Sequence, residues 1–201
     1  MRHVKAVVFW IALAFTIVIP LCVAAQSPLL AWRDPIYIVA GFAGVTAMAL
    51  LLIQPLLAGG YLPGLSTWRA REAHRVTGGI LVGAVVIHIA GLWLTSPPDV
   101  VDALLFVSPT PFSDWGVIAM WAIFAAAFLA VLRKRMRPNR WRIGHTACVA
   151  IAVTTSVAHA MLVEGTMGLV SKSILCVLVL GAAAKVIADR RAWQRRTRWT
   201  R

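Results

Sequence analysis

Charged side chains are scarce in this sequence, and acidic ones are the scarcest. Asp and Glu account for 7 of the 201 residues and Lys and Arg for 20, which leaves a formal net charge of +13. Only 13% of the residues are charged and 60% are hydrophobic. A soluble domain is about a quarter charged and about half apolar. The composition excludes an intrinsically disordered chain, which would be poor in apolar residues, and argues against a water-soluble globule.

Cysteine is rare, and no cysteine belongs to a recognisable motif. Cys22, Cys148 and Cys176 lie singly in apolar stretches, and no CxxC pair occurs. An odd number of cysteines in such places argues against a disulfide framework and against a structural zinc site. The chain also lacks a glycine-rich dinucleotide-binding loop, so we do not expect this chain itself to oxidise a nicotinamide.

Long uncharged runs occupy most of the chain and predict membrane-spanning helices. Five runs of 18 to 34 residues contain no charge, and a bilayer core needs about 20 apolar residues of helix. A sixth stretch carries Lys172 and Lys185 near its ends, where lysine stems can reach the membrane interface. We therefore expect an all-α, six-helix integral membrane bundle, with residues 1–201 forming one transmembrane domain and no soluble flavin or nicotinamide domain. The expected helices are residues 6–25, 36–57, 73–95, 115–133, 143–163 and 168–188.

The basic residues lie almost entirely on one side of the predicted bundle. With six helices, 18 of the 20 lysines and arginines fall at the termini, between the second and third helices, or between the fourth and fifth. Five of the seven acidic residues fall on the other side. The positive-inside rule then predicts a multi-pass protein of the cell (inner) membrane with both termini in the cytoplasm. Because the charge reports topology, we do not expect a nucleic acid as a partner.

The first 25 residues have some features of a signal peptide. They combine a basic start, an apolar stretch and the small residues Val23, Ala24 and Ala25. The apolar stretch is long for a signal peptide, so we favour a retained helix. Cleavage would leave five helices and would not invert the others.

Four of the five histidines form a regular pattern. Thirteen residues separate His74 from His88 on the third predicted helix, and thirteen separate His145 from His159 on the fifth. Fourteen helical steps rise about 21 Å and fall about 40° short of four full turns, so both histidines of a helix face nearly the same way. Since the two helices run in the same direction, His74 can meet His145 near the inner interface, and His88 can meet His159 near the outer one.

Two facing imidazoles can occupy both axial positions of a haem iron, so this pattern predicts two haems across the membrane. Ionisable residues inside a membrane are costly and by default indicate function. A single histidine can instead bond a neighbouring helix, and a histidine-based proton or metal transporter is the non-redox alternative. A zinc or copper site is disfavoured because the two histidines of each helix lie too far apart for four ligands to converge.

Arginines at the inner interface are candidate partners of the haem propionates. Arg71, Arg75 and Arg142 lie close in sequence to the inner histidines. A guanidinium forms strong, often bidentate, hydrogen bonds with a carboxylate. A role as topology-determining charges is the alternative for each of the three.

At these residues the sequence resembles the ferric reductase-like transmembrane domain. That superfamily includes ferric-chelate reductases, NADPH oxidases and the haem-binding membrane subunit of a bacterial methionine sulfoxide reductase system. The resemblance covers about residues 37–188, and it implies two non-covalent b-type haems with His74 and His145 on the inner iron and His88 and His159 on the outer. Its local strings are His74-Arg75-Val76-Thr77-Gly78, Ile87-His88-Ile89, Trp141-Arg142-Ile143-Gly144-His145 and Ala158-His159-Ala160.

The resemblance implies an oxidoreductase component that passes electrons through the membrane. Larger members carry a cytoplasmic FAD/NADPH domain, whereas here the tail after the sixth helix is short, so we expect a separate cytoplasmic flavin reductase or flavoprotein, with FMN or FAD, as donor. The basic segment 133–142 can attract an acidic donor. The expected extracytoplasmic acceptor is a ferric chelate or a periplasmic reductase such as a methionine sulfoxide reductase. A quinol-reduced dihaem cytochrome b is the alternative, and no catalytic acid, base or nucleophile is expected.

Overall fold

The computed structural model describes the backbone of residues 2–199 and the side chains of residues 3–190, so the arginines predicted to end the chain beyond residue 190 lie outside the described side chains. Within this part the chain is all-helical, as predicted, with seven α-helices and no strand. Two short 3₁₀ helices, η1 (Pro28–Leu30) and η2 (Leu132–Arg135), join some of them. The α-helices are α1 (Arg2–Ala25), α2 (Pro35–Gly59), α3 (Thr67–Thr95), α4 (Pro97–Leu104), α5 (Pro111–Val131), α6 (Pro138–Leu162) and α7 (Leu169–Trp199).

Six of these helices, all but α4, are long and apolar enough to cross a membrane, and in the described residues this confirms the predicted number of spans. Five of the six spanning helices begin earlier than predicted, and for α3 and α6 the reason is that an uncharged run stops at an arginine although arginine is a good helix former. Thus α3 begins at Thr67 rather than residue 73, and α6 at Pro138 rather than residue 143. Proline occupies the first helical position of α2, α5 and α6, where its missing N–H costs nothing.

The segment between α3 and α5, which the sequence predicts to be a loop, contains the short helix α4. Pro97 and Pro98 begin this helix, and Asp99 lies in its first turn, where a negative charge is favourable. The Ser96 hydroxyl donates a hydrogen bond of 2.6 Å to the Asp99 carboxylate. This end of the bundle is called the outer end below.

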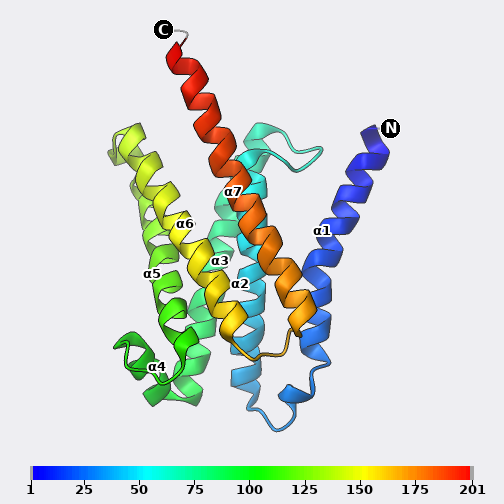
Figure 1. Cartoon of the computed structure of the whole chain (residues 1–201), viewed down its shortest axis with the longest axis vertical. Coiled ribbons are helices and arrows are strands. Elements are labelled where there is room, and N and C mark those ends of the chain that lie inside the picture. The colour runs from blue at the N-terminus through cyan, green and yellow to red at the C-terminus, as the bar shows by residue number, and fades with distance from the viewer. Residues whose placement is uncertain (1, 200–201) are drawn as a thin grey trace.

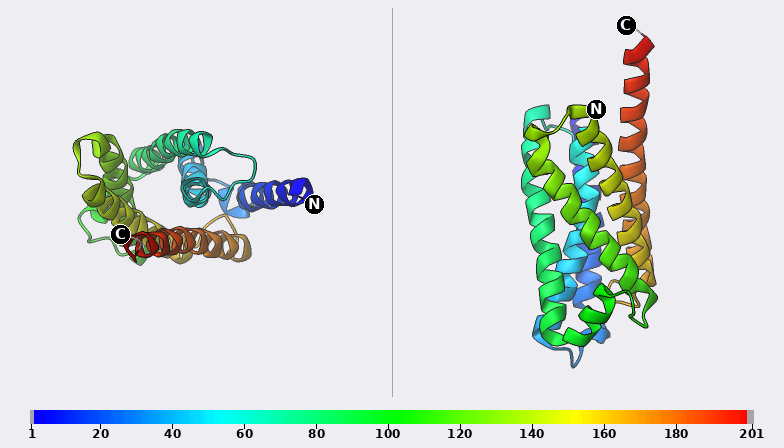
Figure 2. Two further views of the ribbon diagram at one scale, coloured as in Figure 1. Left: turned by 90° about the horizontal axis from the view of Figure 1, so that it is seen from above. Right: turned by 90° about the vertical axis from the view of Figure 1, so that its left-hand side faces the viewer.

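Two helical hairpins and a covering helix make up the bundle (Figure 1). α2 packs along α3, α5 packs along α6, and α7 lies against both α2 and α6. α3 and α6 make at most marginal backbone contact with each other, although both lie inside the bundle. α1 lies at one edge, opposite the α5–α6 hairpin, and contacts only α2 and α7 to any extent (Figure 2).

The first turns of α1 and the last turns of α7 lie at the same end of the bundle, together with the α2–α3 and α5–α6 connections (Figure 1). This inner end therefore carries the basic segments. An even number of crossings requires this arrangement. Which side of the membrane the inner end faces stays a prediction, as does the assignment of residues 1–201 to one domain.

The core consists mostly of small and branched apolar side chains, with Leu175 and Val179 of α7 fully buried. The α2–α3 contact is closest near the outer end. A Cβ atom on Gly91 would lie 2.7 Å from the Cβ of Ala40, so only glycine permits this approach. The contact places the backbone of α2 beside the outer half of α3, which carries His88.

Candidate functional site

The two outer histidines face each other across the bundle. The ring centres of His88 (α3) and His159 (α6) are 6.5 Å apart, and the ring planes form an angle of 77°. Phe112 of α5 packs edge-on against His159, with ring centres 5.9 Å apart. Both imidazoles are largely covered but not fully buried. The outer pair therefore lies between the two hairpins, where the histidine-bearing helices do not pack on each other.

A backbone carbonyl of the partner helix holds each outer imidazole. His88 Nδ1 lies 2.7 Å from the carbonyl oxygen of Ala40 on α2, and His159 Nδ1 lies 2.7 Å from that of Phe112 on α5. A carbonyl only accepts hydrogen bonds, so each Nδ1 carries the proton. In a neutral imidazole this leaves the lone pair on Nε2, which is the arrangement of a metal-ligating histidine supported by a second hydrogen bond.

Glycines make room for the two outer rings. Gly44 and Gly116 follow the accepting residues Ala40 and Phe112 by four positions. A Cβ atom on Gly44 would lie 3.0 Å from His88 Nδ1, and one on Gly116 would lie 2.8 Å from His159 Nδ1. Nothing in the sequence singles out these glycines, because their role depends on which carbonyl each histidine meets.

The inner pair repeats this arrangement with longer hydrogen bonds. His74 Nδ1 donates to the carbonyl of Gln54 over 3.2 Å, and His145 Nδ1 donates to that of Ala126 over 3.1 Å. Trp141 stacks on the His145 ring at 5.3 Å with an interplanar angle of 17°.

The four accepting carbonyls repeat the histidine spacing. Ala40 and Gln54 on α2 are fourteen positions apart, as are Phe112 and Ala126 on α5. Each hairpin therefore has one helix that supplies two imidazoles and one that supplies two carbonyls. No repeat is evident in the sequence, since a backbone carbonyl leaves no side-chain pattern.

The outer pair fits a metal group that is held from two opposite sides. Two metal–nitrogen bonds of about 2 Å, with about 1 Å more from each nitrogen to its ring centre, place axial imidazole rings about 6 Å apart. The 6.5 Å between His88 and His159 agrees with this separation. In the described part of the chain, no three His, Cys, Asp or Glu side chains converge on one metal position. The donor set is thus suited to haem iron, which needs two.

A cavity of about 340 Å³ opens at the inner end, between the end of α2, the start of α6 and α7. Arg142 and Arg190 both line this cavity, and the Arg142 guanidinium also donates to the Asn139 side chain on its own helix over 3.3 Å. Arg190 Nη2 donates to the Ala58 carbonyl over 2.9 Å, and Ala58 follows the residue that supports His74 by four positions. The cavity therefore offers two cations close to the inner histidine pair.

The other arginines predicted to bind haem propionates lie elsewhere. Arg75 donates to the carboxylate of Glu72 on its own helix and is largely exposed, and Arg71 is also exposed. Of the three predicted residues, the structure places only Arg142 in the cavity wall. In the sequence, Arg190 is only one of the basic residues that indicate topology. Its contact with the Ala58 carbonyl depends on how α7 packs on α2, so the sequence could not predict it.

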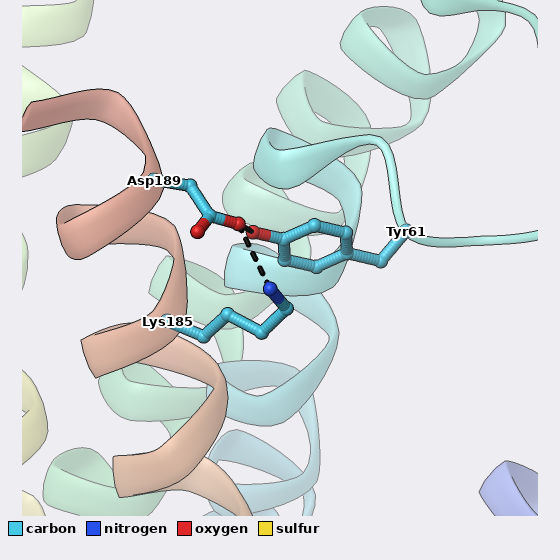
Figure 3. Close-up of polar contacts among 3 residues, drawn as sticks. All are labelled: Tyr61, Lys185 and Asp189. Carbon is cyan, nitrogen blue, oxygen red and sulfur yellow. Dashed lines mark hydrogen bonds and ion pairs between the residues drawn. The ribbon is translucent and has the colours of Figure 1, made fainter. Parts of the chain in front are cut away.

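A polar cluster closes one wall of the cavity (Figure 3). The Tyr61 hydroxyl donates to the Asp189 carboxylate, and Lys185 Nζ lies 3.0 Å from the same carboxylate oxygen. The Lys185 ammonium also lies 5.0 Å from the centre of the Tyr61 ring. Desolvation and, after it, the Asp189 carboxylate raise the pKa of the Tyr61 hydroxyl above its usual value, so it stays protonated at neutral pH. The cluster ties the α2–α3 connection to α7.

One lysine at the outer end is buried. Lys172 of α7 is 8% exposed, and its ammonium donates to the carbonyls of Val163 (2.8 Å) and Met161 (3.3 Å) at the end of α6. The expectation that its stem reaches the membrane interface stays a prediction. The ammonium is held where the turn between α6 and α7 presents the carbonyls at the end of α6 to the first turn of α7.

Comparison with protein families gives one match, to a family described as "ferric reductase like transmembrane component", over residues 40–156. The match covers more than half of the chain. It begins at Ala40, whose carbonyl supports His88, and includes three of the four paired histidines, with His159 just beyond its end. Comparisons with curated proteins and with solved structures give no significant match.

Proposed function

Because this chain belongs to the family of ferric reductase-like transmembrane components, we propose that it carries electrons across the membrane through two b-type haems. Family membership together with six apolar spans indicates a multi-pass membrane protein with a transmembrane electron-transfer function. In the proposal, His74 and His145 ligate the inner iron, and His88 and His159 the outer. When bound, haem iron with two imidazole ligands takes up and releases one electron at a time.

The observation that carries the proposal is the outer imidazole pair. His88 and His159 come from helices that do not pack on each other, their rings lie at the separation of two axial ligands, and both hold the Nδ1–H tautomer. Each Nδ1–H bond to a carbonyl fixes the orientation of the ring and increases the basicity of Nε2. An ordinary histidine that only bonds a neighbouring helix does not require a second imidazole opposite it.

The inner site has the same ligand support and also has cations for the carboxylates of a porphyrin. Arg142 and Arg190 line the inner cavity, and we assign them to the propionates of the inner haem. A charge-assisted hydrogen bond between guanidinium and carboxylate is about twice as strong as a neutral one. Arg190 thereby extends the predicted set of propionate partners, and Arg142 remains in it.

The proposed direction of transfer is from the inner to the outer end. The basic segments at the inner end favour an acidic cytoplasmic flavoprotein or flavin reductase as the electron donor. Ferric chelate outside the membrane is the proposed acceptor, and a periplasmic reductase is the alternative that the same experiment can reveal. The protein needs no acid, base or nucleophile of its own for this transfer.

The test is a reduced-minus-oxidised optical spectrum of the full chain, purified from cells supplied with haem, with the haem-to-protein ratio measured on the same sample. We expect b-type bands and a ratio of two. Each of His74→Ala, His88→Ala, His145→Ala and His159→Ala should lower the ratio to one. The absence of b-type bands would refute the proposal, and a ratio of two in all four variants would refute the ligand assignment.

Reduced flavoprotein is then added to the haem-loaded chain in lipid vesicles, with ferric chelate sealed inside. Reduction of the enclosed chelate in wild type, but not in His88→Ala, is the expected result. If an added periplasmic reductase oxidises the haem while the chelate stays ferric, the reductase and not the chelate is the acceptor.

A further inference from the structure

We infer that Lys172 supplies a buried positive charge that raises the reduction potential of the outer haem site formed by His88 and His159. The inference rests on the proposed function, because it concerns a haem held by these two histidines. It adds a role for a residue that neither ligates iron nor contacts a ligand histidine.

The ammonium of Lys172 lies one helical turn beyond His159. It donates to the carbonyls of Met161 and Val163, and the Val163 N–H in turn donates to the His159 carbonyl over 3.1 Å. These contacts hold the last turn of α6 against the first turn of α7. They place a cation at the negative end of the α6 dipole, where a positive charge is favourable.

No carboxylate neutralises this cation among the described residues. The ion pairs there are Arg75–Glu72 and Lys185–Asp189, and Lys172 takes part in neither. Glu164, near the end of α6, is exposed. A buried charge without a counter-ion is expensive, so a neutral side chain at this position would be the cheaper way to end α6. The retained charge therefore points to a function beyond capping.

Solvent screens this charge only weakly. Reduction adds one electron to the iron, so a nearby positive charge stabilises the reduced state and raises its potential. Salt and water screen exposed charges, whereas Lys172 is 8% exposed and lies within the apolar part of α7. The effect favours the movement of an electron from the inner site to the outer one.

Lys185 provides a matched contrast on the same helix. It is exposed, lies at the inner end and is paired with Asp189 at 3.0 Å. The carboxylate cancels most of its field, and solvent screens the remainder. Lys185→Gln thus removes a lysine charge from α7 and should leave the outer potential unchanged.

The test is a spectroelectrochemical titration of the full, haem-loaded chain in lipid, in which the outer haem is assigned as the one lost in His88→Ala. Lys172→Gln keeps a hydrogen-bond donor but loses the charge, and it should lower the outer potential while both haems remain. Lys172→Arg keeps the hydrogen-bond donor and the charge, so its outer potential should stay close to that of wild type. An unchanged outer potential in Lys172→Gln, or an equal fall in Lys172→Arg, would overturn the inference.

A second pair of variants tests the same field if Lys172→Gln does not accumulate. Leu169 is exposed in the first turn of α7, three positions before Lys172. At low ionic strength, where an exposed charge is least screened, Leu169→Glu places an opposing charge three positions from Lys172 and should lower the outer potential relative to Leu169→Gln. Equal potentials in these two variants would overturn the inference, whereas a chain without b-type bands would instead refute the proposed function.

Discussion

The outer and inner histidine sites have the same design but differ in how tightly they are enclosed. At the outer site both Nδ1–carbonyl distances are 2.7 Å, and glycines lie directly beneath the rings. At the inner site the distances are 3.2 and 3.1 Å, and alanines (Ala58 and Ala130) occupy the positions that correspond to the glycines. The outer imidazoles are therefore held by shorter hydrogen bonds than the inner ones.

The surroundings of the two sites differ in charge as well. The outer site has one buried cation, Lys172, bound to carbonyls. The inner site has two guanidinium groups in a cavity that opens at the basic end of the bundle. Under the proposed function, the inner site would exchange electrons with a partner from solution, and buried contacts would hold the geometry and potential of the outer site.

The largest expected effect comes from filling the space beneath an outer ring. Gly116→Ala would place a Cβ atom 2.8 Å from His159 Nδ1, so the imidazole must move and most of the outer haem should be lost. Gly41→Ala on α2, with nothing within 4 Å of its Cβ position, is the matched control and should keep both haems. The haem-to-protein ratio is measured for both variants. If Gly116→Ala kept a full outer haem, the glycine beneath the ring would not distinguish the outer site from the inner one.

Loss of a cavity cation should weaken the inner site alone. Arg190→Gln removes a guanidinium from the cavity and its bond to the Ala58 carbonyl, so we expect several-fold faster transfer of the inner haem to an apo-globin acceptor. Release of the outer haem should not change. Arg69→Gln, an exposed arginine at the same end, serves as the control. Equal release from both sites would show that Arg190 acts on the whole bundle.

A side-chain contact beside the inner site should affect stability but not haem binding. Gln54 Nε2 donates to the Thr77 hydroxyl over 2.8 Å, whereas His74 uses only the backbone carbonyl of Gln54. Gln54→Leu should therefore keep two haems and lower the free energy of unfolding by about 1 kcal/mol, the typical value of one hydrogen bond. Thr77→Val should cost a similar amount, and the double variant little more. Haem loss in Gln54→Leu would contradict this separation.

The smallest effect is expected at the polar cluster on the cavity wall. Because the folded state raises the pKa of Tyr61, it binds the phenolic proton more tightly than the unfolded chain does. The resulting stability is complete below the unfolded value of about pH 10 and is lost as the pH rises further. Tyr61→Phe should slightly lower the melting temperature at neutral pH and flatten its alkaline decline. If the melting temperature of Tyr61→Phe fell above pH 10 as steeply as that of wild type, other groups would be the cause of the fall.

The histidine pairing follows from the sequence because it needs only helix geometry and the parity of the spans. The spacing of His74 and His88, and that of His145 and His159, places the rings of each helix on one face, and the third and fifth of successive spans run in the same direction. The assignment of these residues as haem ligands stays a prediction. The supporting carbonyls could not be predicted, because every residue has one and only the crossing of α2 with α3, or α5 with α6, selects which carbonyl meets an imidazole.

The sequence by itself determined the all-α class, the six spans and the separation of the basic end from the acidic end. The length of each apolar run decides whether it can span a bilayer, and the positions of the charges between the runs can be read directly from the sequence. The tertiary structure decided where the long cations point. Lys172 and Arg190 both turn towards carbonyls at the ends of neighbouring helices, α6 and α2. A flexible side chain has many rotamers of similar energy, so only the neighbours that α7 packs against select one of them.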